Sequence, residues 1–134
     1  MSRGRLLVVA GLIEGEVPGR FLVSRRPSGT HLAGHWEFPG GKLEAGEAPA
    51  DALVRELKEE LDIDVVVGDP YAVGHHVYEE REIVLLVLHC RHVGGTPKPL
   101  GVAELAWLEA REIIALDLPP ADRPVIERLR RDWP

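Results

Sequence analysis

Three glutamates stand close together near the middle of the chain, at Glu56, Glu59 and Glu60. Each residue of an α-helix turns by about 100°, so on a helix these carboxylates would share one face within about one turn. Like charges at this spacing destabilise a helix by about a few tenths of a kcal/mol per pair unless something offsets them. Mg²⁺ would do so, because it pairs carboxylates with substrate phosphates. A charged face turned to solvent is the alternative, and the glutamates alone do not separate the two.

The segment that precedes this acidic stretch could supply a second kind of ligand. It reads Phe38, Pro39, Gly40 and Gly41. Paired glycines let a backbone carbonyl or N–H group approach a metal or a phosphate closely. A plain turn, which Pro-Gly-Gly forms unaided, is the alternative.

Taken together, these residues match a signature that is long enough to be specific. The signature of the Nudix hydrolases is G-x5-E-x7-R-E-U-x-E-E-x-G-U, in which U is a bulky aliphatic residue. The chain resembles this family at eight of the nine fixed positions, which are Gly41, Glu47, Arg55, Glu56, Leu57, Glu59, Glu60 and Ile63. The exception is Asp62, where the family has Gly. That position resembles the left-handed end of a helix, which Asp tolerates at some cost.

The resemblance extends over most of the chain, towards the MutT-like branch that cleans up nucleotide pools. Residues 23–26, His31, residues 36–41 and residues 118–124 look like segments of that branch. The resemblance implies the Nudix fold, an α+β arrangement in which a mixed β-sheet is sandwiched between α-helices. It also implies hydrolysis of a nucleoside diphosphate linked to a further group X, with Mg²⁺ or Mn²⁺. A triphosphate substrate would leave as the monophosphate and pyrophosphate.

The resemblance further implies a role for each matching residue. Glu56, Glu59 and Glu60 would be the catalytic, metal-binding glutamates, and a carbonyl of Gly40 or Gly41 would complete the metal's shell. Glu56 is also the candidate for activating the attacking water. Glu47 and Arg55 would brace the segment. The substrate would be bound by Arg26, His31, Glu37, Phe38, Pro39, Gly40 and Asp122, with Arg26 and His31 at the phosphates and Asp122 at the base.

A second departure from the family concerns the metal site. MutT-like relatives often carry an extra glutamate ligand six residues before the Trp of the segment that corresponds to 105–108. Gly101 occupies that position here. Glu104 is close in sequence and could substitute; if it does not, we expect the number of bound metals or the identity of the base to differ from the relatives'.

Asp122 bears on which base is bound. An ionised Asp only accepts hydrogen bonds, so it would pair with the exocyclic amine of cytosine or with the N–H groups of a guanine-type base. Both choices remain open. Two other functions are also open: hydrolysis of another substrate, such as ADP-ribose or a dinucleoside polyphosphate, and nucleotide binding without catalysis.

The elements that must position these residues follow from the hydrophobic pattern. Apolar, β-rich runs predict strands at 6–13, 21–24, 36–38, 63–67, 71–78, 82–90 and 105–108, with a break at 68–70. Helices are expected at 48–61, 110–116 and 119–131. Pro49 suits the first turn of the acidic helix. On that helix Leu57, Leu61, Ala50 and Val54 fall on one face, which we expect to be buried.

Length and composition set the outer limits. The chain has 134 residues, which suits one domain over 1–134. A formal net charge of −6 weighs against a nucleic acid polymer as partner, and a bound metal would reconcile it with an anionic nucleotide. The single cysteine, Cys90, allows no intrachain disulfide, and no apolar stretch reaches the length of a membrane span. We expect a cytoplasmic protein, monomer or homodimer, without a membrane partner.

Overall fold

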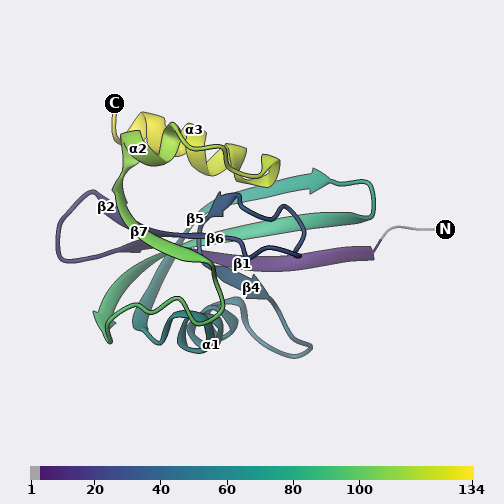
Figure 1. Cartoon of the computed structure of the whole chain (residues 1–134), viewed down its shortest axis with the longest axis horizontal. Helices are drawn as coiled ribbons and strands as arrows, with labels where there is room; N and C mark the ends of the chain where they lie inside the picture. The colour runs from purple at the N-terminus through teal and green to yellow at the C-terminus, as the bar shows by residue number, and fades with distance from the viewer. Residues whose placement is uncertain (1–3) are drawn as a thin grey trace.

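The computed structural model describes residues 4–134 and is built on one mixed β-sheet (Figure 1). Five strands follow the order β3-β2-β1-β6-β5, while β4 pairs with β1 and β7 with β2. The strands are β1 (Gly4–Glu14), β2 (Arg20–Arg25), β3 (Trp36–Glu37), β4 (Gly40–Lys42), β5 (Asp64–Val77), β6 (Arg81–Gly94) and β7 (Glu104–Glu109). The helices are α1 (Pro49–Leu61), α2 (Ala110–Ile114) and α3 (Arg123–Asp132), with a 3-10 turn η1 (Pro120–Asp122). The sheet lies between α1 on one side and α2 with α3 on the other, which confirms the predicted sandwich.

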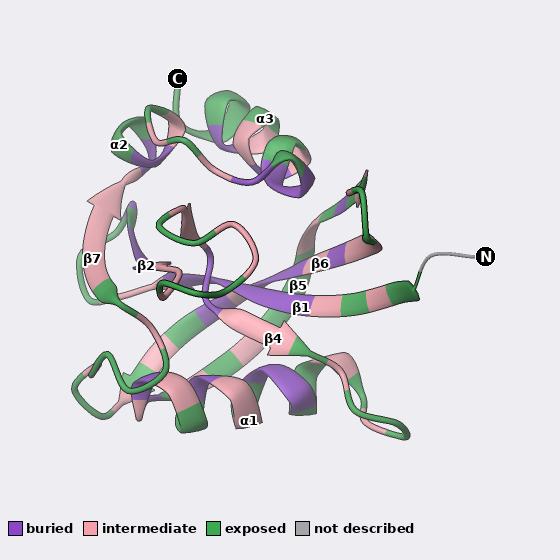
Figure 2. Cartoon of the chain, turned by 45° about the vertical axis from the view of Figure 1, so that its right-hand side comes forward, coloured by how far each residue is buried: buried purple, intermediate pink, exposed green. Residues whose placement is uncertain are grey.

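Strand β6 lies inside the sheet, between β1 and β5. It runs parallel to β1 and antiparallel to β5. Its side chains alternate between two cores: Leu85 and Val87 face the layer of α2 and α3, whereas Leu88 and Cys90 face α1. Figure 2 shows the buried part of β1 in the middle of the molecule and its exposed beginning projecting from it. This shared sheet is the rigid base on which the loops of the candidate site are held.

The predicted break at 68–70 is wrong, because β5 continues through it. The register against β6 shifts between Val67 and Pro70 and again between Pro70 and Ala72, which marks a β-bulge. β5 stands at the edge of the sheet, so the missing N–H group of Pro70 costs no hydrogen bond to a further strand. The bulge therefore accommodates Gly68 and Pro70 within one strand, where the sequence pattern predicts two separate strands.

The acidic helix α1 buries a stripe that shares only Leu57 and Leu61 with the predicted one. Its buried residues are Ala52, Leu53, Leu57 and Leu61, whereas Ala50 is exposed and Val54 is 42% exposed. The buried stripe is thus turned towards the face of the glutamates, which places their stems at the edge of the protein interior. With 13 residues α1 is the longest helix, and no helix within residues 4–134 is long and apolar enough to cross a bilayer.

The end of α1 agrees with the expectation from the family, whereas the start of the last helix differs from the predicted start. Asp62 closes α1 in the left-handed conformation at φ 56°, as the family's Gly implies. The last predicted helix does not begin at Pro119. The chain first makes the 3-10 turn η1, closed by the Asp122 N–H group on the Pro119 carbonyl at 2.9 Å, and α3 then starts at Arg123. This turn sets the direction of the Asp122 side chain.

Candidate active site

Arg55 joins the loop before α1 to the acidic face of the helix. Its Nε and Nη2 donate to the two carboxylate oxygens of Glu47 at 2.8 and 2.9 Å. Its Nη1 donates to Glu56 at 3.0 Å and to Glu59 at 3.3 Å. The hydrogen bonds from Arg55 are the main reason that the pKa of Glu47 falls to about 2. Arg55 therefore holds Glu56 in place as well as the loop, which is the bracing role that the family resemblance implies for it.

The two glycines of β4 are required by two different close approaches. A side chain on Gly40 would collide with the carbonyl of Val9 on the neighbouring strand β1. A Cβ on Gly41 would lie 2.5 and 2.7 Å from the carboxylate oxygens of Glu56. A side chain on Gly41 would displace the Glu56 carboxylate, so Gly41 leaves the room that this carboxylate occupies.

The glutamates of α1 occupy two environments. Glu56 has only 14% of its side chain exposed, whereas Glu59 is 59% exposed and turns to solvent. Glu60 is partly buried, and its pKa rises to about 7, first because burial penalises its charge and then because Glu56 and Glu37 carry like charge nearby. Because Glu56 and Glu60 repel each other, a positive charge bound near them would be stabilising.

This donor set suits a hard divalent cation. Within residues 4–134, no three His, Cys, Asp or Glu side chains are gathered closely enough to hold an ion by themselves. The oxygens of Glu56, Glu60 and the Gly40 carbonyl would therefore share an ion with water and substrate. That is the manner in which Mg²⁺ is usually bound, with few protein carboxylates and several other oxygens.

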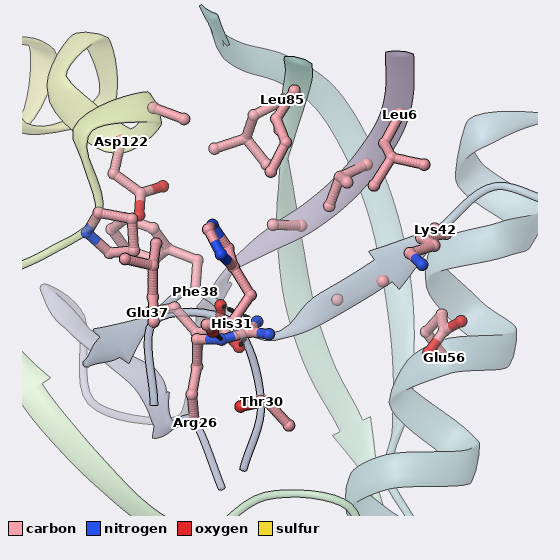
Figure 3. A pocket seen from close by; sticks show the side chains of 18 of the residues that line it. Leu6, Arg26, Thr30, His31, Glu37, Phe38, Lys42, Glu56, Leu85 and Asp122 are labelled. Atoms are coloured by element: carbon pink, nitrogen blue, oxygen red, sulfur yellow. Dashed lines mark hydrogen bonds and ion pairs between the residues drawn. The ribbon is translucent and has the colours of Figure 1, made fainter. Parts of the chain in front are cut away.

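One cleft of about 400 Å³ connects this acidic end to Asp122 (Figure 3). Figure 3 shows Glu56 on α1 at one side and Asp122 at the other, with Arg26, Glu37 and His31 between them. Apolar residues of the central strands line it as well, and these are Leu6, Val8, Ala10, Ile83 and Leu85. A volume of this size is typical of a small-molecule site.

An ion pair occupies the middle of the cleft. Nη1 of Arg26 contacts Glu37 at 3.1 Å, and Nε of Arg26 donates to the carbonyl of His31. Burial raises the pKa of Glu37, while Arg26 opposes the rise. Arg26 thus fixes the loop that carries His31 and balances Glu37, whose charge acts on Glu60 at one end of the cleft and on Asp122 at the other.

His31 faces the cleft from a loop and packs edge-on against Tyr78, with ring centroids 4.7 Å apart. Burial lowers its pKa below 6.5, and Arg81 and Arg26 lower it further, so the imidazole is neutral at pH 7. Its Nε2 is buried and has no hydrogen-bond partner among residues 4–134. A neutral imidazole with a free ring nitrogen can bind a ligand through one hydrogen bond, not through its charge.

Asp122 closes the far end of the cleft. The residue is 4% exposed, and burial, with the charge of Glu37 added, raises the pKa of its carboxyl to about 8. It stands at the N-cap of α3 yet makes no capping hydrogen bond. Burial therefore favours the protonated carboxyl of Asp122, which can also donate a hydrogen bond, over the ionised form considered in the sequence analysis.

The structure brings most of the predicted site residues into this one cleft. The lining includes Arg26, His31, Glu37, Phe38, Gly40, Gly41, Glu56, Glu60 and Asp122. Four others do not line it: Glu47 and Glu59 contact Arg55, which also lies outside the lining, and Pro39 is buried with its carbonyl bound to the Gly11 N–H group at 2.8 Å. Tyr78 also lines the cleft, and sequence reasoning missed it because an aromatic residue at a strand end gives only a weak signal.

Gly101 lies in the cleft beside Glu60. Its N–H group donates to the Glu60 carbonyl at 3.1 Å, and a Cβ there would stand 3.0 Å from Cγ of Glu60. Glu104 does not take its place, because it lies outside the lining and pairs with Arg25 at 3.6 Å. The side of Glu60 that faces Gly101 thus has no further carboxylate within the described chain.

Comparison with known proteins settles the family. The sequence profile described as "NUDIX domain" matches residues 8–128. This chain belongs to the Nudix hydrolase family. Over 125 residues this Nudix hydrolase is 40% identical to a protein of Escherichia coli K12 named "CTP pyrophosphohydrolase", covering 90% of this chain and 87% of that protein. It is also 40% identical over 129 residues to a "Putative 8-oxo-dGTP diphosphatase 2" of Mycobacterium tuberculosis H37Rv, with 93% and 88% covered.

A solved structure supports the same assignment. The crystal structure of a MutT protein from Methanosarcina mazei Go1 superimposes with a TM-score of 0.87 over 98% of this chain and 97% of the other, at 28% sequence identity. The predicted MutT-like placement of this Nudix hydrolase is confirmed. Nudix enzymes are typically dependent on a divalent metal, which agrees with the donors gathered at Glu56 and Glu60.

Proposed function

We propose that this Nudix hydrolase converts nucleoside triphosphates into the monophosphate and pyrophosphate in nucleotide-pool sanitation, with oxidised guanine or cytosine nucleotides as substrates. The observation that carries the proposal is the layout of the cleft. Glu56 and Glu60 stand at one end, Asp122 stands at the other, and Arg26 and His31 lie between them. A nucleotide has the same order of parts, with phosphates at one end and a base at the other.

We assign the metal, Mg²⁺ or Mn²⁺, to the acidic end. Glu56 and Glu60 would hold it with the carbonyl of Gly40 or Gly41, and Glu59, which reaches Arg55, lies outside the lining of the cleft. A bound Mg²⁺ neutralises phosphate charge and activates water. This accounts for the binding of an anion by a protein with a formal net charge of −6.

The chain's own residues orient the reacting groups. Glu56 is fixed by Arg55 and by the space that Gly41 leaves, so its free oxygen can accept the proton of an attacking water. Arg26 offers its guanidinium to phosphate oxygens, and His31 offers its unpaired ring nitrogen. Phe38 is buried at the wall of the cleft and forms part of the surface against which a base would rest. Positioning and electrostatics then provide most of the rate enhancement.

Asp122 supports two classes of base. A protonated carboxyl offers one donor and one acceptor side by side. Cytosine presents an amine beside a ring nitrogen that accepts, and 8-oxoguanine presents its N7–H group beside the C8 carbonyl, a pair that guanine lacks. Each base therefore pairs with the same protonated Asp122, and the two relatives carry one name from each class.

The test is a panel of nucleotides with purified protein and Mg²⁺. It contains 8-oxo-dGTP, dGTP, dCTP, dUTP, ADP-ribose and a dinucleoside polyphosphate, and the products are separated by chromatography. We expect monophosphate and pyrophosphate from 8-oxo-dGTP or dCTP. Cleavage of ADP-ribose or the dinucleotide alone would contradict the proposed substrates while keeping the enzyme class.

Glu56→Gln is the matched variant for this panel. The amide keeps the size of the side chain but loses the charge and the basic oxygen, so we expect turnover to fall by about 100-fold or more. Glu127→Gln, on the exposed side of α3, is the control and should keep full turnover. Normal turnover of Glu56→Gln would show that the acidic end of the cleft is not the reacting site.

A further inference from the structure

The turn that carries Asp122 rests on a glycine of the edge strand. Gly74 of β5 is buried and pairs with Leu85 of β6, while its neighbours Val73 and His75 are exposed. A Cβ on Gly74 would collide with the carbonyl oxygen of Ala121 and would lie 3.0 Å from its carbonyl carbon and 3.7 Å from its Cα. The backbone of η1 thus occupies the space that any side chain at position 74 would need.

The atoms in contact belong to the peptide unit that leads into Asp122. The carbonyl of Ala121 and the N–H group of Asp122 share one planar peptide group, so a displacement of the carbonyl moves the Asp122 backbone with it. That backbone is already held by a short turn, through the Asp122 N–H group on the Pro119 carbonyl. The carboxyl, which forms no cap on α3, takes its direction into the cleft from this turn.

The residue that directly follows strand β5 supplies another wall of this end of the cleft. Tyr78, four residues after Gly74, shares its side of the chain and lines the cleft next to His31. The depth at which η1 sits on Gly74 therefore sets the spacing between the Asp122 carboxyl and the Tyr78 side chain, which directly follows β5.

We infer that Gly74 is the positioning residue for base selection: the absence of its side chain sets how far Asp122 reaches into the cleft. The inference rests on the proposed function, in which Asp122 contacts the base. It adds a residue outside the Nudix signature that never touches the substrate and acts through the Ala121–Asp122 peptide.

The test measures base discrimination by equilibrium binding, so that it does not depend on turnover. Isothermal titration gives the Kd of two pairs of nucleotides, 8-oxo-dGMP against dGMP and dCMP against dUMP, for the wild type and for Gly74→Ala. We expect the variant to lose about tenfold of the wild-type discrimination in the preferred pair, since a misplacement of about 1 Å costs up to about 100-fold. The kcat/KM values for the matching triphosphates should shift in parallel, through KM more than through kcat.

The matched control is Gly68→Ala in the same strand. A Cβ there would lie 3.3 Å from the carbonyl oxygen of His89, so it also presses on backbone, but away from η1. We expect this variant to keep the wild-type discrimination within about twofold. Equal losses in Gly68→Ala and Gly74→Ala would mean that both act by disturbing β5 in general, which would overturn the inference.

A double-mutant cycle separates positioning from general destabilisation. If Gly74 acts through Asp122, adding Gly74→Ala to Asp122→Ala causes no further loss of discrimination, whereas independent effects would add. Asp122→Glu in the Gly74→Ala background should recover part of the loss, because a longer acid spans the displacement. Additive losses in the cycle would overturn the inference.

A second variant covers the case in which Gly74→Ala does not fold. Ala121→Gly leaves Gly74 in place and only frees the backbone of the turn, so it should also weaken discrimination. Unchanged discrimination in Ala121→Gly would then contradict the inference. If the wild type cleaves triphosphates but discriminates neither pair, the roles of Asp122 and Gly74 are refuted while the proposed reaction stands. If it discriminates the bases but cleaves no triphosphate, only the proposed reaction is refuted.

Discussion

At the scale of single residues, Asp122 shows how burial changes what a side chain can recognise. Its pKa of about 8 keeps the carboxyl protonated at pH 7, and a protonated carboxyl presents a donor that a carboxylate lacks. Glu37 and Tyr78 are the groups that face it, and the negative charge of Glu37 favours the protonated form. The same burial therefore couples the group proposed to contact the base to the stability of the fold.

This coupling predicts a pH dependence. The pKa of Asp122 in the folded protein is raised above its ordinary 3.8. The contribution of its protonated carboxyl to the free energy of unfolding is therefore complete below about pH 4 and is lost progressively as the pH rises to about 8. Asp122→Asn does not titrate. We expect its free energy of unfolding, measured by urea denaturation, to improve relative to the wild type between pH 4 and 8 and to stay level above that. A difference that is constant with pH would show that Asp122 is ionised in the folded protein.

At the scale of elements, Arg55 ties the loop 43–48 to α1 through a two-point contact with Glu47. Lysine keeps the charge but cannot form that planar pair while also reaching Glu56. We expect Arg55→Lys to lower kcat by about tenfold, because Glu56 loses its fixed position, and to make the loop more sensitive to protease. Arg111→Lys, which alters an exposed ion pair on α2, is the control and should change neither measurement.

The predicted elements were mostly right in kind, and their errors have identifiable causes. Helical spacing alone predicts that Ala50 and Val54 are buried. In the structure α1 is rotated about its axis so that Leu53 packs against the sheet, and spacing along the helix cannot reveal that rotation. Gly68 and Pro70 indicate a break in any isolated segment, and only their position on an edge strand makes a bulge the better solution.

The two ends of the candidate site also differ in how well the sequence predicts them. The acidic end follows from local spacing within one helix and the glycines before it, which the sequence displays directly. Asp122 lies near Gly74 and Tyr78 because segments distant in sequence contact one another, so no local sequence pattern could predict this arrangement.

At the scale of the whole molecule, stability should depend on the metal. An ion that binds the folded chain and not the unfolded one raises the melting temperature with its concentration. We expect Mg²⁺ to raise the Tm of the wild type over an EDTA sample of equal ionic strength, and to have little effect on a Glu56→Gln, Glu60→Gln double variant. Equal shifts in both proteins would mean that the ion binds elsewhere.

The parallel pairing of β1 with β6 has a consequence for how the chain reaches this state during synthesis. Paired residues such as Arg5 and Glu82 are 77 positions apart, so β1 leaves the ribosome long before its partner. Contacts of such separation form late and slow the folding of small proteins. Until β6 emerges, the apolar edge of β1 is a site for pairing with other nascent chains. The demand on chaperones should therefore peak while the segment between these two strands is being translated.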